Sequence, residues 1–336
     1  MSASISRLCL CLCFIACFVV VNAAPIPVLD LGELTKRADI VAIGTVVSMS
    51  DLGPISQDAT IGRISARRMA AQLLIDQIIK GPQLTSVQFQ FALADAPGAA
   101  LGAVDAGSYR MFFLKRQSDR FELADPYYPS LVASPGHQST SATAYEKVLE
   151  AVAFVVGAGP ASARQKREAI DALWGIRHPT SISALRAALN DGDSNIRLSA
   201  AAALLKINDV SALPTAETAL TQGDPNASFE TLQNLRVAIA EGGRNAQSVE
   251  SLARLVSKGD VETRRAAASA LRSMRSPGAA NVLADALSDN DEIVRYMAVS
   301  ALAEVNREPE WGPSLPAFQA DQQRYLNYWM ERTRKR

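Results

Sequence analysis

The stretch DEIVRYMAVSALAEV, residues Asp291–Val305, decides the fold because closely similar stretches occur upstream. DVETRRAAASALRSM begins at Asp260, and DSNIRLSAAAALLKI begins at Asp193. Weaker copies begin at Asp224 (DPNASFETLQNLRVA) and at Ser162 (SARQKREAIDALWGI). From the first start to the last, the spacings are 31, 31, 36 and 31 residues. A repeat of roughly 20–50 residues is typical of proteins built from stacked structural units.

Each stretch predicts the second helix of a pair, because an Ala- and Leu-rich run follows the leading polar residue. Gly and Pro residues fall between the predicted helices, where helices end. No pair covers its own apolar face, so the pairs are expected to stack into a solenoid. The predicted pairs are residues 143–157 with 163–177, 180–190 with 194–207, 211–222 with 227–240, 246–257 with 261–274, and 278–288 with 292–305.

The second-helix pattern D-x-x-V-R-x-x-A-x-x-A-L is best matched by Asp291, Val294, Arg295, Ala298, Ala301 and Leu302. With it, residues 143–306 resemble HEAT repeats of the short, PBS-lyase-like kind. The resemblance implies that the leading Asp caps the second helix and that the Arg bridges to the next repeat. It therefore implies a structural role for the ladder Asp193, Arg197, Asp260, Arg264, Asp291 and Arg295. The bilin-lyase activity of some relatives is only an analogy of fold.

The pattern of residues 28–125 predicts a small β domain. Leu31–Ala38 has the apolar spacing of a short helix, and a β-branched run from Asp39 predicts a buried strand with a bend at Gly44. Residues 67–79 fit a helix or a strand by periodicity alone. Further strands are predicted at 86–93, 109–115 and 121–124, which together suggest a closed or partly closed barrel.

Three segments of this domain, ADIVAIGTV from Ala38, IIKGP from Ile78 and GSYRMFFL from Gly107, resemble the OB barrel of netrin modules and TIMPs. The resemblance covers about residues 30–125 and implies that residues 67–79 form a strand. Family members that inhibit metalloproteinases bind the catalytic zinc through an N-terminal Cys. Here the four Cys residues all lie between Cys9 and Cys17. Only the barrel is therefore carried over.

The remaining segments complete a multidomain α plus β chain, in which a small OB-like β-barrel is followed by an α-helical HEAT-repeat solenoid. Residues 126–142 are rich in Pro, Ser, Thr and Gly, which predicts a connector with His137 as a solvated loop residue. Residues 311–336 predict an amphipathic capping helix and a basic tail. The apolar residues expected to cover the open end of the stack are Phe318, Tyr325, Leu326 and Trp329.

The N-terminus predicts a cleaved signal peptide over residues 1–23. Arg7 precedes an apolar run, Leu8–Val21, and Val21-Asn22-Ala23 fits the small-residue cleavage pattern. The run is shorter than the roughly 20 residues that span a bilayer. The protein is therefore expected to be secreted or periplasmic. The alternative is an uncleaved segment, which would be its only contact with a membrane.

Composition excludes several classes of function. Lys+Arg and Asp+Glu are both 34, so no overall charge attracts nucleic acid. The two His residues, His137 and His178, are too few for a His-based metal site, and His178 is interpreted as a helix cap. No phosphate loop, nucleophile elbow or paired Cys motif is present. We therefore expect no cofactor, no metal and no enzymatic activity.

The remaining candidate site is a surface of the solenoid. Residues five and nine after each repeat start share one helix face, which is expected to be the outward, concave side. The pairs are Arg167 with Asp171, Leu198 with Ala202, Phe229 with Gln233, Arg265 with Ser269, and Tyr296 with Ser300. Mixed apolar and Arg residues favour binding of another protein. The candidates are Arg167, Leu198, Phe229, Gln233, Arg265, Ser269, Tyr296 and Ser300.

The sequence thus predicts a non-enzymatic interaction protein whose solenoid binds another protein. In the first alternative, the barrel binds a ligand or inhibits a secreted hydrolase without a cysteine. In the second, weaker alternative, the chain is a lyase-like enzyme that acts on a protein-bound cofactor.

Overall fold

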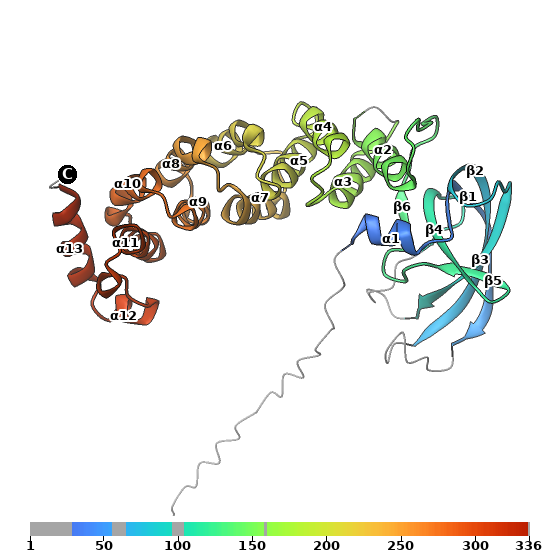
Figure 1. The fold of residues 1–336 in the computed structure, drawn as a ribbon, viewed down its shortest axis with the longest axis horizontal. Coiled ribbons are helices and arrows are strands. Elements are labelled where there is room, and N and C mark those ends of the chain that lie inside the picture. Colours follow the sequence, from blue (N-terminus) through green and yellow to red (C-terminus); the bar gives the residue numbers. More distant parts are fainter. Residues whose placement is uncertain (1–28, 56–64, 96–103, 158–159, 335–336) are drawn as a thin grey trace, which may run out of the picture.

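The structure is a computed structural model that describes residues 29–55, 65–95, 104–157 and 160–334. The predicted signal peptide, residues 1–23, lies outside these ranges. Within them, no helix has both the length and the apolar character needed to cross a membrane. Figure 1 shows a β domain at one end of a long row of helices.

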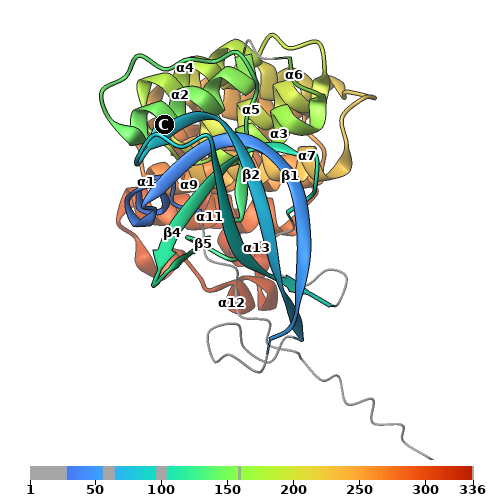
Figure 2. The same ribbon diagram turned by 90° about the vertical axis from the view of Figure 1, so that its right-hand side faces the viewer.

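The β domain is a five-stranded closed barrel. Its strands are β1 (Ile40–Pro54), β2 (Ala66–Lys80), β3 (Ser86–Ala94), β4 (Tyr109–Gln117) and β5 (Arg120–Leu123). β1 pairs with both β2 and β4, and a parallel pairing of β3 with β5 completes the closure. This connectivity is that of an OB-like barrel, as predicted, and residues 67–79 form a strand. In Figure 2 the two long strands β1 and β2 bend together around the barrel.

Gly44 allows β1 to bend where the sequence predicted it. The register between β1 and β2 shifts between Ile43 and Gly44. A β-carbon at Gly44 would lie only 2.0 Å from the carbonyl oxygen of Leu74. The backbones therefore approach more closely than any side chain permits.

The barrel begins with a short helix, α1 (Leu31–Arg37), which Lys80 caps. The Lys80 ammonium donates to the carbonyl oxygens of Thr35 at 2.9 Å, Lys36 at 3.1 Å and Ala38 at 2.5 Å. These carbonyls at the helix C-terminus have no partner within the helix and attract a cation. The Lys of the K-G-P motif therefore fixes α1 against the end of β2.

Ten helices form the two layers of the solenoid. The first members of the pairs are α2 (Ala144–Gly157), α4 (Pro179–Ala188), α6 (Leu213–Gln222), α8 (Val249–Lys258) and α10 (Pro277–Asp285). The second members are α3 (Ala163–Ala172), α5 (Ser194–Lys206), α7 (Phe229–Gly242), α9 (Val261–Met274) and α11 (Glu292–Asn306). Figure 1 shows the second helices on the inner side of an arch, toward which the barrel and the C-terminal end also project.

The third repeat begins four residues later than predicted. Ser162, Asp193, Asp260 and Asp291 are the N-caps of α3, α5, α9 and α11, and their side chains accept backbone N–H groups. In α7 the N-cap is Ser228, not Asp224. Residues between Asp224 and Ser228 form a turn that begins with a proline, so the helix starts after it.

The stack ends with two further helices, α12 (Leu315–Ala320) and α13 (Gln322–Arg334). Phe318, Leu326 and Trp329 are buried against the last repeat, and Tyr325 is half-buried, so the predicted cap is confirmed. The predicted basic tail is partly wrong. α13 continues through Arg334, and Arg332 forms an ion pair with Glu308.

Residues 126–142 are not a loose connector. They contain β6 (Ser130–Val132), which pairs with β4. The segment from Ser130 to Ser134 is buried. Two hydroxyl groups further along, those of Ser139 and Ser141, donate to the Glu150 carboxylate of α2. The composition indicated a linker, but apolar residues among the Pro and Ser attach the segment to both neighbours.

As a result, the outer side of the barrel packs into the hydrophobic core of the solenoid, while the barrel interior forms its own cluster. Alternate residues of β4, Phe112 and Leu114, fill the barrel, while Met111 and Phe113 join a second cluster. That cluster includes α1, α2 and the rest of the solenoid. Both faces of the strand are buried, which explains the unbroken apolar run in its sequence. On the polar side of this joint, Arg110 of β4 forms an ion pair with Glu168 of α3.

His137 belongs to this joint and is not the solvated residue predicted. Its ring stacks on Phe154 of α2, with 5.0 Å between ring centroids. Its Nε2 atom is buried and has no hydrogen-bond partner among the described residues. Burial lowers the pKa of His137, an effect that the nearby Glu150 carboxylate opposes. Folding therefore favours the neutral imidazole.

This arrangement makes the joint sensitive to acid. Because the folded-state pKa of His137 is lowered, its contribution is fully present above the unfolded pKa of about 6.5 and is lost as the pH falls through the folded value. His137→Phe should remove this loss, measured as thermal unfolding between about pH 7 and pH 5.5. His178→Asn removes the other histidine and keeps a capping oxygen, so it should retain the wild-type trend. Equal trends in all three proteins would contradict the account.

Candidate functional site

The predicted binding column is only partly on the surface. Leu198 is 1% exposed and Ser300 is 4% exposed, so the prediction that they lie on an open face is wrong. α5 is apolar on almost every side, and α3 and α7 flank it. The face of α5 that was predicted to be open is therefore covered. Ser300 is covered where the C-terminal cap meets α11.

Other predicted residues are engaged within the chain. Arg265 contacts Asp291 through two hydrogen bonds of 3.0 and 2.7 Å. Tyr296 packs on Phe318 of the cap, and Ser269 is half-buried. Gln233 is half-buried and accepts a hydrogen bond from Arg236 at 3.0 Å. Arg167 and Phe229 remain exposed.

The corrected start of α7 identifies a residue that the sequence argument missed. Counted from Ser228, the positions five and nine residues on are Gln233 and Val237. Val237 is 51% exposed. The Ser at position 228, after a Pro-containing turn, was the available signal for a helix start.

Three exposed apolar side chains lie on the neighbouring helices α7 and α9, namely Phe229, Val237 and Val261, and we call them the α7–α9 patch. Phe229 is 76% exposed and Val261 is 37% exposed. Phe229 and Val237 are eight residues apart and share a helix face with Gln233. Val261 opens α9 as Phe229 opens α7, so the two are equivalent residues of adjacent repeats. Among the described residues, the other large exposed apolar side chains lie on the barrel, namely Val47, Leu52 and Leu74.

Beside this patch, a polar hollow of 350 Å³ lies over α5, between α3 and α7. Its lining includes Arg167, Asp171, Ser199, Glu230, Thr231 and Asn234. Asp171 is open to solvent yet has protein on most sides, as expected at the base of a concave surface. Burial raises the pKa of the Asp171 carboxyl, Arg167 opposes this, and the carboxylates of Glu230 and Glu168 reinforce it.

The Asp and Arg ladder is structural, as the resemblance implied. Arg264 donates to both carboxylate oxygens of Asp289 in the next repeat, at 2.9 and 3.0 Å. Arg197 approaches Asp224 at 3.6 Å, and Lys166 contacts Asp191 at 2.6 Å in the first repeat. Asp224, which was predicted to start a repeat, is therefore an acceptor in this ladder.

Arg295, in the last repeat, has no further repeat to contact and donates instead to Gln322 of the cap at 2.8 Å. It also donates to the carbonyl oxygens of Asp289 and Asn290, and so stabilises the turn that precedes α11. The hydrogen bond from Arg265 lowers the pKa of Asp291, which at the same time caps α11. The Asp291 carboxylate thus joins two repeats.

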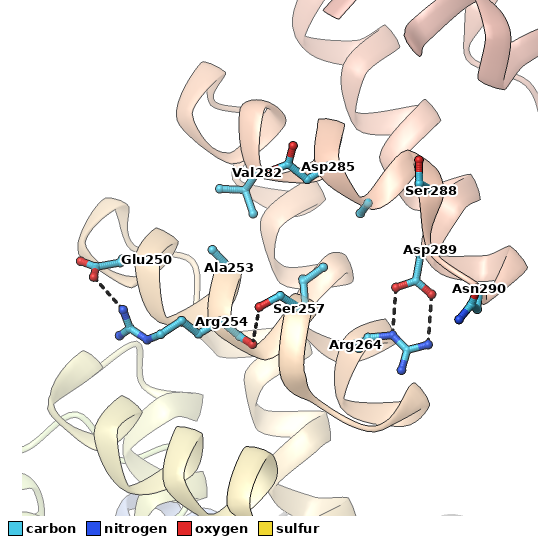
Figure 3. Close-up of a pocket in the computed structure, with 12 residues that line it drawn as sticks. Glu250, Ala253, Arg254, Ser257, Arg264, Val282, Asp285, Ser288, Asp289 and Asn290 are labelled. Atoms are coloured by element: carbon cyan, nitrogen blue, oxygen red, sulfur yellow. Dashed lines mark hydrogen bonds and ion pairs between the residues drawn. The ribbon is translucent and has the colours of Figure 1, made fainter.

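A larger hollow, of 680 Å³, lies between α8 and α10 on the outer layer. Figure 3 shows Arg254 directed toward Glu250, and the guanidinium of Arg264 facing Asp289. Both cations are therefore already paired. A similar groove of 360 Å³, bordered by Arg197 and Asp224, lies between α4 and α6. We interpret these grooves as a product of the repeat and not as a dedicated site.

The chain's histidines do not meet at a common site. His178 caps α4 by accepting the N–H of Thr180 at Nδ1, 3.3 Å away, which confirms its predicted role. His137 lies at the joint, against α2. Within the described ranges, no group of three or more His, Cys, Asp or Glu residues is placed to hold a metal ion.

Comparison with known proteins identifies the repeat. The family of HEAT repeats matches residues 158–236 and 230–303. The helical part of the chain is thus a HEAT-repeat solenoid, preceded by an OB-like barrel. Among solved structures, human deoxyhypusine hydroxylase in complex with glycerol is 14% identical, with 56% of this chain and 96% of that chain covered and a TM-score of 0.21. No curated protein matches.

The ladder predicts a difference between two arginines. Arg264→Gln should lower the free energy of unfolding by about 1–2 kcal/mol, because the Asp289 carboxylate then loses a two-point partner. The control is Arg186→Gln, since Arg186 pairs with Asp209 but its side chain is 56% exposed, against 20% for Arg264. This control should cost less than about 0.5 kcal/mol. Chemical denaturation measures both, and equal losses would contradict a special role for the ladder.

Proposed function

We propose that the protein is a non-enzymatic scaffold whose solenoid binds another protein through the inner side of the arch. The observation that carries the proposal is the α7–α9 patch. A Phe with 76% of its surface in solvent has no packing role within the fold. Exposed apolar groups that cluster and are bordered by polar residues mark interaction surfaces.

The surroundings of the patch support this proposal. Polar and charged groups of the hollow over α5 border it on one side, including Glu230, Thr231 and Asn234 of the same helix. An apolar centre beside a polar rim is the usual anatomy of a protein interface. Phe229 would act as the anchor, because large aromatic side chains contribute most to binding.

A second candidate function involves the barrel, as a ligand binder or as an inhibitor of a secreted hydrolase. The observation in its favour is that Val47, Leu52 and Leu74 are exposed on β1 and β2. Because the outer side of the barrel packs into the core of the solenoid, the two candidates are best separated by point variants and not by isolated domains.

The double variant Phe229→Ser with Val237→Ser should weaken binding to the native partner at least tenfold. It should leave the melting temperature almost unchanged, since both side chains are already in water. The partner is first captured by a photo-crosslinking residue at position 233, and its affinity is then measured with purified proteins. Val47→Ser with Leu74→Ser is the matched control. If the control loses the partner and the double variant keeps it, the barrel is the binding part.

We further propose that the protein works outside the cytoplasm, on the strength of the sequence of residues 1–23. Protein purified from its native source should then begin at Ala24, and the mass of its N-terminal peptide measures this. An N-terminal peptide that still contains Leu8–Val21 would contradict cleavage.

A further inference from the structure

A separate pocket lies at the far end of the solenoid, where α9 and α11 end. It has a volume of 260 Å³. We call it the distal pocket, and its lining includes Arg272, Ser300, Glu304, Arg307, Pro309 and Gly312. It differs from the α7–α9 patch in position and in chemistry, because its lining combines two arginines, a carboxylate and a hydroxyl with Ala and Pro residues.

The distal pocket has an excess of positive charge. Arg272 and Arg275 share one carboxylate, that of Glu304, at 3.0 and 3.5 Å. Arg307 has no ion-pair partner among the described residues. The next acidic residue, Glu308, is already paired with Arg332. Two guanidinium groups, those of Arg272 and Arg307, therefore line the pocket together with one carboxylate, which Arg275 also neutralises from outside the lining.

The backbone at two of these arginines is unusual. Arg275 and Arg307 end α9 and α11 in the left-handed region, with φ of 48° and 59°. Residues with a β-carbon are disfavoured there, and Gly or Asn normally takes this position. The end of α5 follows the usual preference, with Asn208 at a φ of 65°. Two adjacent repeats thus place a guanidinium where backbone geometry favours another residue.

The base of the pocket has an unused hydrogen-bonding group. Ser300 is buried, and its hydroxyl has no hydrogen-bond partner in the described part of the chain. Buried polar groups are rarely left without a partner. Ser300 lines the same pocket as Arg272 and Arg307, and its unpaired hydroxyl is consistent with a site organised for a polar ligand.

We propose that the distal pocket binds an oxyanion, the carboxylate or phosphate group of a ligand. Planar guanidinium groups match the paired oxygens of both groups. The volume is below the roughly 300–1,000 Å³ of pockets that enclose a whole small molecule. The pocket therefore holds the charged head of the ligand, and the remainder lies outside. This site is independent of the proposed protein-binding surface.

The test uses the full chain with inorganic phosphate and with acetate, titrated separately at constant ionic strength with chloride as the balancing anion. Wild-type protein should bind at least one of them saturably, by calorimetry or by chemical shifts. Binding of phosphate alone identifies a phosphate-bearing ligand, and binding of acetate identifies a carboxylate. No saturable binding of either anion overturns the proposal.

The variant Arg275→Gly with Arg307→Gly should weaken anion binding at least tenfold without lowering the melting temperature, because glycine suits both left-handed positions. Asn208→Gly makes the same backbone change far from the pocket and should leave anion binding unchanged. Arg307→Gln alone should also weaken binding, which covers the case in which the double variant fails to fold. Unchanged affinity in the arginine variants would overturn the proposal, since the cations would then serve only the helix ends.

Discussion

The structure depends on the burial of apolar faces that no helical pair covers alone. Alanines of α5 and α9 allow neighbouring helices to approach closely, and the core is continuous from α1 to the cap. Stability is therefore shared between neighbours, as in other solenoids. The barrel supplies the cover at one end, through Met111 and Phe113, and Phe318 and Trp329 supply it at the other.

Closure at both ends leaves the two long sides of the arch open, and we propose the inner one for binding. Most charges near it are committed to the fold, as with Arg265 and Asp291. The exposed groups that remain are the α7–α9 patch and the hollow next to it. The distal pocket has unmatched cations instead of apolar groups. The two proposed sites therefore share α9, with Val261 at its start and Arg272 near its end, but differ in chemistry.

Sequence periodicity predicted the helices and most barrel strands, because these depend on local spacing and on residue type. The capping role of the Asp residues and the strand at 67–79 were predicted from the family resemblances. Periodicity placed the start of the third repeat at Asp224 instead of Ser228, because Asp224 resembles the other repeat starts and the turn after it is longer than in the other repeats. It also missed the joint, because a segment rich in Pro and Ser is buried by distant partners that local composition does not reveal. Exposure of Leu198, Ser300 and Val237 depends on how helices flank one another, which the sequence does not give.

The central claim is that the outer side of the barrel packs into the core of the solenoid, so that the two parts have a fixed geometry. Native-state hydrogen exchange of residues 130–134, β4 and α2 tests it most directly. The account predicts that these amides are protected to a similar degree and lose protection together as denaturant is added. Free exchange at residues 130–134, with the barrel and α2 opening independently, would contradict it.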